Sequence, residues 1–245
     1  MIRTDLALEA QELYRENAAA ESAIDGVETD ISQTGNVSVT KIRITNENGA
    51  TALGKPVGTY VTVEAPDLKF NEKDYETACR LAADAIREML SPKPEHVTLV
   101  VGLGNRNVTP DALGPAAVDR LMITTHMKKH MPEYLDDSIG GVCAIIPGVL
   151  GTTGLESAEI VGGVVKEAKP DAVIAIDALA ARSPDRLSTT IQIGNTGIRP
   201  GAGIGNRRGG LSQEALGVPV IAIGVPTVID ASTIVQDTVF QIVQA

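Results

Sequence analysis

Aromatic residues are scarce in this sequence of 245 residues. They make up 2% of it, and tryptophan is missing. We therefore expect a core of Val, Ile, Leu and Ala, with glycine where two stretches of backbone approach closely. Hydrophobic residues still account for 43% and charged residues for 21%, which is typical of an ordinary globular protein. The length suits one large α/β domain or two small ones.

Positive charge, cysteine and long apolar runs are also limited. The net charge of −10 argues against a nucleic-acid partner, because phosphate binding needs clustered Lys and Arg. No stretch reaches about 18 apolar residues, and the polar N-terminus has no signal-peptide core, so we expect a cytoplasmic protein with no membrane partner. The two cysteines, Cys79 and Cys143, lie on separate apolar segments without CxxC spacing, which predicts buried free thiols.

The first third of the chain predicts two helices and an antiparallel hairpin. Residues 5–23 mix apolar positions with Glu and favour a helix. Residues 37–45 and 58–66 alternate with period two and are separated by a segment rich in turn residues, which predicts a β-hairpin or a pair of antiparallel strands. Asn71 is placed to cap a following helix that ends before Pro92.

The rest of the chain follows a different pattern. Helical segments at about 114–131, 155–168 and 212–216 separate most of four unbroken apolar runs. Such runs predict strands buried on both faces, in a mostly parallel sheet covered by helices on both faces. No linker or internal repeat is visible, so the prediction is a single α/β domain over 1–245. The runs are HVTLVVGLGN, GVCAIIPGV, AVIAIDAL and PVIAIGVPTVID.

Two aspartates come after predicted strands of this sheet. Asp111 lies in the loop after the first apolar run, and Asp177 ends the third. Parallel sheets carry their working residues beyond the carboxyl ends of the strands. Two carboxylates that meet there share a proton, so that one activates a water while the other protonates the leaving group. The alternatives are that Asp111 caps the next helix and that Asp177 forms an ion pair with Arg182 or Arg186.

Other motifs give weaker signals. The tract over 194–210 contains Gly201, Gly203 and Gly205 but no GxGxxG, so we interpret it as an ordered loop whose backbone N–H groups bind a peptide. His126 and His130 have metal-ligand spacing, but the two lysines between them would repel a cation, which favours a solvated helix end. No metal or other cofactor is expected. The sequence has no GxSxG motif that would present a serine nucleophile. Cys143 lies in an apolar strand, which disfavours a nucleophilic thiolate.

Several stretches together resemble the germination proteases, from about residue 3 to about residue 238. The resemblance implies an aspartic-type endopeptidase, a hydrolase with an α/β fold similar to the hydrogenase-maturation proteases. It implies catalytic roles for Asp111 and Asp177, and it implies that the protein degrades small acid-soluble spore proteins in the spore core during germination. Arg106 stands where we expect an aromatic residue, and its charge would influence Asp111. The stretches are RTDLALEA, GLGNRNVTPDALGP, PGVLGTTGLESAEIV, IAIDALAARS, TIQIGNTGIRPGAGIGNRR and LGVPVIAIGVPTVIDASTI.

The resemblance further implies a precursor, or zymogen, that cleaves itself between Asp5 and Leu6, with residues 1–5 as a short prosegment. Substrate sites in the family carry an acidic residue, an apolar residue, Ala and then Glu, and the chain's own start has this pattern. A homotetramer is also implied. Two other functions stay open: a metal-dependent protease of the hydrogenase-maturation type that uses the two aspartates and His126, and a non-catalytic peptide-binding relative that uses the glycine-rich loop.

Overall fold

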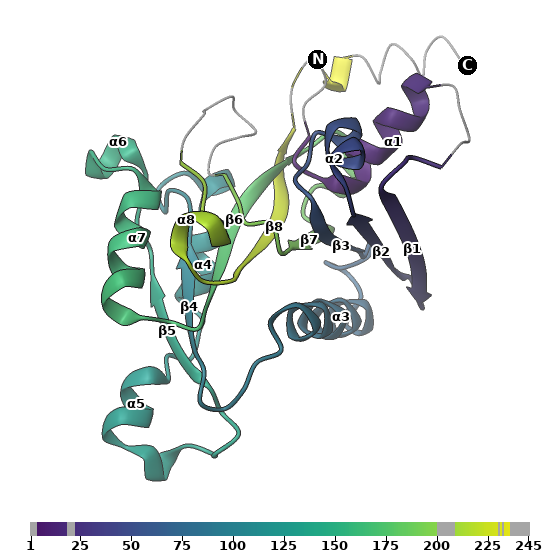
Figure 1. The fold of residues 1–245 in the computed structure, drawn as a ribbon. Helices are drawn as coiled ribbons and strands as arrows, with labels where there is room; N and C mark the ends of the chain where they lie inside the picture. Colours follow the sequence, from purple (N-terminus) through teal and green to yellow (C-terminus); the bar gives the residue numbers. More distant parts are fainter. Residues whose placement is uncertain (1–3, 19–22, 200–208, 230, 232, 236–245) are drawn as a thin grey trace. The chain divides into compact units, whose positions relative to one another are not determined.

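The computed structural model describes residues 4–18, 23–199, 209–229, 231 and 233–235. They form two compact units. The first unit consists of the described residues within 1–83, 179–192 and 224–245, and the second of those within 84–178 and 193–223. The strands have the order β1-β2-β3-β7-β8-β6-β4-β5 (Figure 1). The prediction of a single domain stays a prediction.

The first unit is built on an antiparallel meander. Strands β1 (Val27–Thr34), β2 (Val37–Ile44) and β3 (Gly58–Glu64) pair in sequence order. Helices α1 (Ala7–Ala18) and α2 (Glu47–Leu53) lie beside β2 and β3 and share a core with them (Figure 1). The predicted pairing of residues 37–45 with 58–66 is confirmed, but strand β1 and helix α2 were not predicted.

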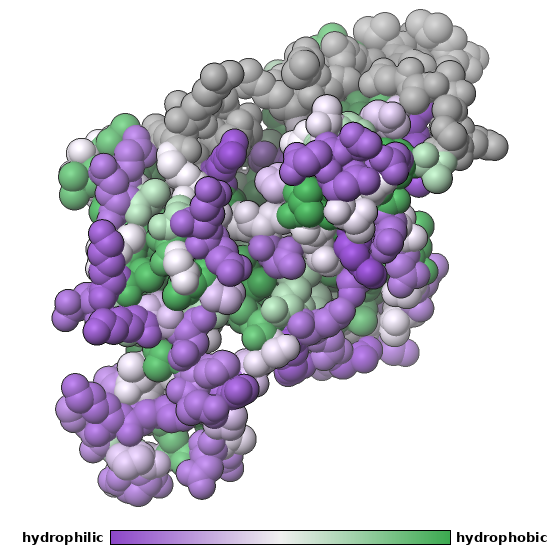
Figure 2. All heavy atoms as spheres, in the orientation of Figure 1, coloured by the Kyte–Doolittle hydropathy of each residue, from purple (hydrophilic) through white to green (hydrophobic). Residues whose placement is uncertain are grey.

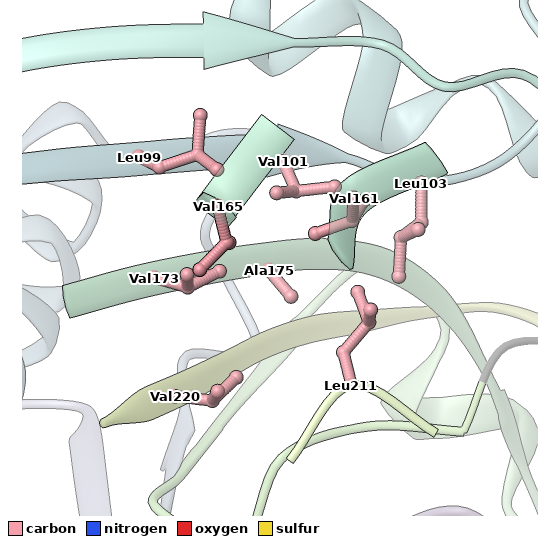
Figure 3. Close-up of a cluster of buried hydrophobic side chains, with 9 residues drawn as sticks. All are labelled: Leu99, Val101, Leu103, Val161, Val165, Val173, Ala175, Leu211 and Val220. Atoms are coloured by element: carbon pink, nitrogen blue, oxygen red, sulfur yellow. The ribbon is translucent and has the colours of Figure 1, made fainter. Parts of the chain in front are cut away.

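The second unit contains the parallel part of the sheet. Strand β4 (Val97–Gly102) lies between β5 (Gly141–Ile145) and β6 (Ala172–Ala181), parallel to both. Alternate side chains of a strand point to opposite faces. On one face, Leu99 and Val101 pack against helix α7 (Ser157–Ala168), as Figure 3 shows. On the other face, Gly102 contacts helix α4 (Leu113–Val118), so helices cover both faces of this part of the sheet.

The predicted elements are mostly present, with corrections. The four apolar runs form β4, β5, β6 and β8 (Val220–Ile229), and the helix predicted after Asn71 is α3 (Glu72–Leu90). The sheet is mixed, so the prediction of a mostly parallel sheet is not confirmed; nor is the kinship to hydrogenase-maturation proteases. The helical segment predicted at 114–131 forms two helices, α4 and α5 (Thr125–His130). The remaining elements are α6 (Leu150–Thr153), β7 (Thr190–Gly194) and α8 (Gln213–Leu216).

The exposure of the cysteines and the hydropathy of the helices bear on two further predictions. Both cysteines are free, but Cys79 is exposed on α3 and Cys143 is only partly buried, so the prediction of buried thiols is wrong for Cys79. Within the described part of the chain, none of the helices combines the length and the hydropathy that crossing a bilayer requires.

Candidate active site

The backbone around Gly104 determines where Asp111 lies. Asp111 ends a single 3-10 turn, Thr109–Asp111, in the loop after β4. The N–H of Asn105 donates to its Oδ2 at 2.8 Å and to its backbone carbonyl at 3.0 Å. Gly104 has a φ of 109°, and a Cβ there would lie 2.0 Å from the Asp111 carbonyl oxygen. Only glycine therefore allows this turn to close on the strand end.

Asp177 lies inside strand β6 and not at its end. The strand continues to Ala181, which corrects the prediction that Asp177 ends it. Its carboxylate Oδ1 accepts a hydrogen bond from the N–H of Ala178 at 2.9 Å. Asp177 is only 7% exposed, and burying a carboxylate costs free energy unless hydrogen bonds or an opposite charge compensate for it.

Both aspartates belong to the second unit: Asp177 lies on β6, and Asp111 lies in the loop after the neighbouring strand β4. Gly102 of β4 is in register with Ile176 of β6, and the N–H of Leu103 donates to the Ile176 carbonyl at 2.8 Å. A Cβ on Gly114 would lie 2.3 Å from the Leu103 oxygen and 2.5 Å from the Ile176 oxygen. The residues on either side of the Asp111 turn, Leu103 at the end of β4 and Gly114 in α4, thus lie against Ile176, which directly precedes Asp177.

The structure also tests the other roles considered for these aspartates. The N-cap of α4 is Ala112, and no side chain caps that helix, so the helix-capping role of Asp111 is wrong. Arg182 and Arg186, the suggested partners of Asp177, both bind glutamates of the first unit. Arg106 forms a two-point ion pair with Asp119, at 2.6 and 3.0 Å.

The surroundings of Asp111 favour its protonated form. Burial raises the pKa of the Asp111 carboxyl, and the hydrogen bond from the Asn105 N–H offsets this only in part. A raised pKa makes a carboxyl group a better general acid than an unperturbed aspartate.

The predicted cleavage site, Asp5–Leu6, is held within the first unit by hydrogen bonds to Asp5 and by burial of Leu6. The backbone N–H of Asp5 donates to the Ala180 carbonyl at 2.9 Å, and its Oδ2 accepts from the Ala180 N–H at 2.8 Å. The carbonyl oxygen of Asp5 accepts from Lys55 Nζ at 2.8 Å and from Gln192 Nε2 at 3.0 Å. The side chain of Leu6 is fully buried.

Glu9 anchors the following helix, α1. It is fully buried, and its carboxylate accepts from the backbone N–H groups of Arg182 at 2.7 Å and Ser183 at 2.9 Å. Arg186 Nη1 lies 3.3 Å from Glu9 and 2.7 Å from Glu12. Sequence reasoning missed Lys55, Gln192 and these anchors, because nothing in the local sequence of Lys55 or Gln192 indicates a remote partner.

The remaining predicted site residues carry less information. Gly201, Gly203 and Gly205 lie outside the described residues. His126 and His130 are exposed on α5, and Figure 2 shows a mostly hydrophilic surface over that part of the second unit. Among the described residues, no group of three or more His, Cys, Asp or Glu side chains is arranged to hold a metal ion. Burial raises the pKa of the Cys143 thiol, which disfavours a nucleophilic thiolate there.

Comparisons with known proteins identify the family. Residues 7–245 match the family model described as germination protease. The germination protease of Caldanaerobacter subterraneus subsp. tengcongensis is 52% identical over 244 residues, which cover 99% of this chain and 74% of the relative. That of Clostridium tetani is 49% identical over 239 residues, covering 97% and 73%, and that of Bacillus velezensis is 46% identical over 245 residues, covering 98% and 66%. The chain therefore belongs to the germination protease family and is, by that membership, a protease.

Proposed function

We propose that this chain is an endopeptidase that hydrolyses small acid-soluble spore proteins during germination, with Asp111 and Asp177 as an aspartic-type catalytic pair. The observation that carries the proposal is that Asp111 packs against Gly104 at the end of β4, while Leu103 and Gly114, on either side of the Asp111 turn, lie against Ile176, the residue of β6 that precedes Asp177. This packing supports a pair of carboxyl groups at one end of two parallel strands, where α/β proteins hold their reacting groups.

The two aspartates take different roles in the proposed reaction. Asp111, whose pKa is raised by burial, is assigned the role of proton donor, and Asp177 is assigned the role of the base that accepts a proton from the attacking water. The water oxygen bonds to the carbonyl carbon of the substrate. The C–N bond then breaks, and Asp111 supplies the proton that the leaving nitrogen needs.

The protein is further proposed to be a zymogen that cuts its own Asp5–Leu6 bond. This bond has the acidic–apolar–Ala pattern, and the two hydrogen bonds between Asp5 and Ala180 hold Asp5 in one defined conformation within the first unit. Action in the cytoplasm of the spore core and assembly as a homotetramer belong to the same proposal. Sedimentation velocity of the purified protein tests the assembly.

The deciding experiment compares Asp111→Asn and Asp177→Asn with the wild type on a peptide from a small acid-soluble spore protein. Each substitution keeps the shape of the side chain but removes its acid–base function, so we expect cleavage to fall by at least 10²-fold, on the order of a lost general acid or base. Asp137→Asn, on an exposed turn residue, is the matched control and keeps full activity. Circular dichroism checks that each variant is folded. Cleavage by the Asp177→Asn protein at the wild-type rate would falsify the site.

A further inference from the structure

The carbonyl group of Asp5 is bound in a way that an ordinary helix start does not require. We propose that Lys55 and Gln192 form a carbonyl-binding site that polarises the peptide bond after an acidic residue, first in the chain's own Asp5–Leu6 bond and then in a substrate. The inference rests on the proposed autoprocessing at that bond.

Two donors converge on one oxygen atom. The Lys55 ammonium lies 2.8 Å and the Gln192 amide nitrogen 3.0 Å from the Asp5 carbonyl oxygen. The orientation of the Gln192 amide is fixed from its other end, because its Oε1 accepts the backbone N–H of Ala7 at 2.6 Å. Preorganised donors of this kind stabilise the negative charge that develops on a carbonyl oxygen when water attacks.

The same site also binds the acidic side chain of Asp5. Asp5 pairs with Ala180 twice, through its backbone N–H and through its carboxylate Oδ2. The second contact needs an acceptor at the end of the side chain, and a carboxylate hydrogen bond is about twice as strong as a neutral one. The positive charge of Lys55 adds to this preference. An acidic residue before the cleaved bond therefore fits the site better than an apolar one.

The chemical step balances with water as the only other reactant. The water oxygen bonds to the carbonyl carbon of Asp5, and the charge on the carbonyl oxygen is held by Lys55 and Gln192. The bond from that carbon to the Leu6 nitrogen breaks, and this nitrogen gains a proton. The products are an α-carboxylate on Asp5 and an amine on Leu6. When the cleaved segment leaves, Lys55, Gln192 and the backbone of Ala180 are open to an acidic residue of another peptide.

The test uses Lys55→Met and Gln192→Glu. The second variant keeps the acceptor for the Ala7 N–H but turns a carboxylate oxygen toward the Asp5 carbonyl. Intact mass spectrometry follows the appearance of the chain that starts at Leu6. We expect the rate to fall by about 10²-fold, the loss typical of one oxyanion donor. Lys73→Met, on an exposed position of α3, is the control and processes at the wild-type rate.

The processed protein gives a second measurement, on a peptide with an acidic residue before the cleaved bond. A loss in kcat supports the proposal, and a loss confined to KM overturns it, since the donors would then bind the ground state alone. Processing at the wild-type rate by folded Lys55→Met and Gln192→Glu proteins also overturns it. A wild-type protein that cuts neither itself nor the peptide contradicts the proposed function instead.

Lys55→Arg keeps the inference testable if the other variants do not fold. Burial lowers the pKa of Lys55, and the carboxylates that face it, Asp5 and Glu9, only partly offset this. Wild-type processing should therefore decline with rising pH before lysine's usual titration range. An arginine stays charged, so the Lys55→Arg protein should keep its rate to higher pH. Identical pH profiles for the two proteins would overturn the role of the cation.

Discussion

Replacing Glu9 by Gln tests how the start of α1 is held. The Glu9 side chain is 0% exposed, and its two oxygens face two backbone N–H groups and the Arg186 guanidinium. Thr4 donates a further hydrogen bond from its hydroxyl group. Every one of these partners is a donor. A glutamine of the same shape supplies one acceptor oxygen, and its NH2 group must face at least one donor.

The cost follows from the kind of hydrogen bond that is lost. A hydrogen bond to a charged group contributes about 1.5–3 kcal/mol, and breaking a buried ion pair costs about 3–5 kcal/mol. Arg186 keeps Glu12 and Glu64 as partners, which reduces the loss. We therefore expect Glu9→Gln to lower the free energy of unfolding by about 2–4 kcal/mol. In a chain of this length that is a fall in Tm of roughly 5–15 °C.

Urea titration followed by circular dichroism measures the change, with Glu12→Gln as the matched control. Glu12 lies on the same helix and binds the same arginine through two hydrogen bonds of 2.7 Å, but its side chain is 41% exposed. Exposed ion pairs contribute about 1 kcal/mol or less, so the control should lose far less stability. Equal losses in the two variants, or a loss below about 0.5 kcal/mol for Glu9→Gln, would refute the assignment of Glu9 as a buried anchor.

Three further predictions concern the proposed active site. Because the folded-state pKa of Asp111 is raised, its contribution to stability is present below the unfolded value of about 3.9 and is lost as the pH rises through the folded pKa. The stability of Asp111→Asn relative to the wild type should therefore increase over that range; urea titrations at several pH values check this, and a pH-independent difference counts against it. Gly104→Ala should cost more than about 1 kcal/mol and abolish peptide cleavage, whereas Gly151→Ala, where a Cβ meets nothing within 4 Å, should do neither. A chelator should leave peptide cleavage unchanged; a loss that added Zn²⁺ restores would favour the metal-dependent alternative.

The sequence predicts buried elements better than exposed ones. The apolar runs of β4, β5, β6 and β8 are strands because a doubly covered strand needs apolar side chains on both faces. Strand β1 has the sequence VETDISQT and is exposed at almost every position, so no apolar alternation indicated it. Helix α2 was interpreted as a turn because of its Asn and Gly residues. In the structure Asn46 caps it by accepting the Gly49 N–H, and Gly54 ends it with a φ of 62°.

The candidate site shows a different limit. Asp111 and Asp177 could be proposed as candidates because each carries a local signal, a carboxylate after an apolar run; their catalytic role stays a prediction. The length of β6 could not be predicted, since a charged residue looks like a strand end although residues 179–181 are again apolar and buried. Lys55 and Gln192 carry no local signal at all. They meet Asp5 only because the fold joins segments that are 50 and 187 residues apart in the chain.

The contacts on the two sides of the Asp5–Leu6 bond determine what the proposed cleavage would leave behind. On the C-terminal side, the fully buried Leu6 side chain contributes about 1.5–3 kcal/mol, and the buried Glu9 remains covalently attached to α1. On the N-terminal side, Asp5 is held by a neutral hydrogen bond from Gln192, which contributes about 0.5–1.5 kcal/mol net, and by charge-assisted hydrogen bonds with Lys55 and Ala180, which contribute about 1.5–3 kcal/mol each. A released segment regains translational and rotational freedom estimated at about 4–15 kcal/mol. That gain favours dissociation of the segment that precedes Leu6 after the proposed cleavage, so we expect the proposed carbonyl-binding site to become free while helix α1 stays in place.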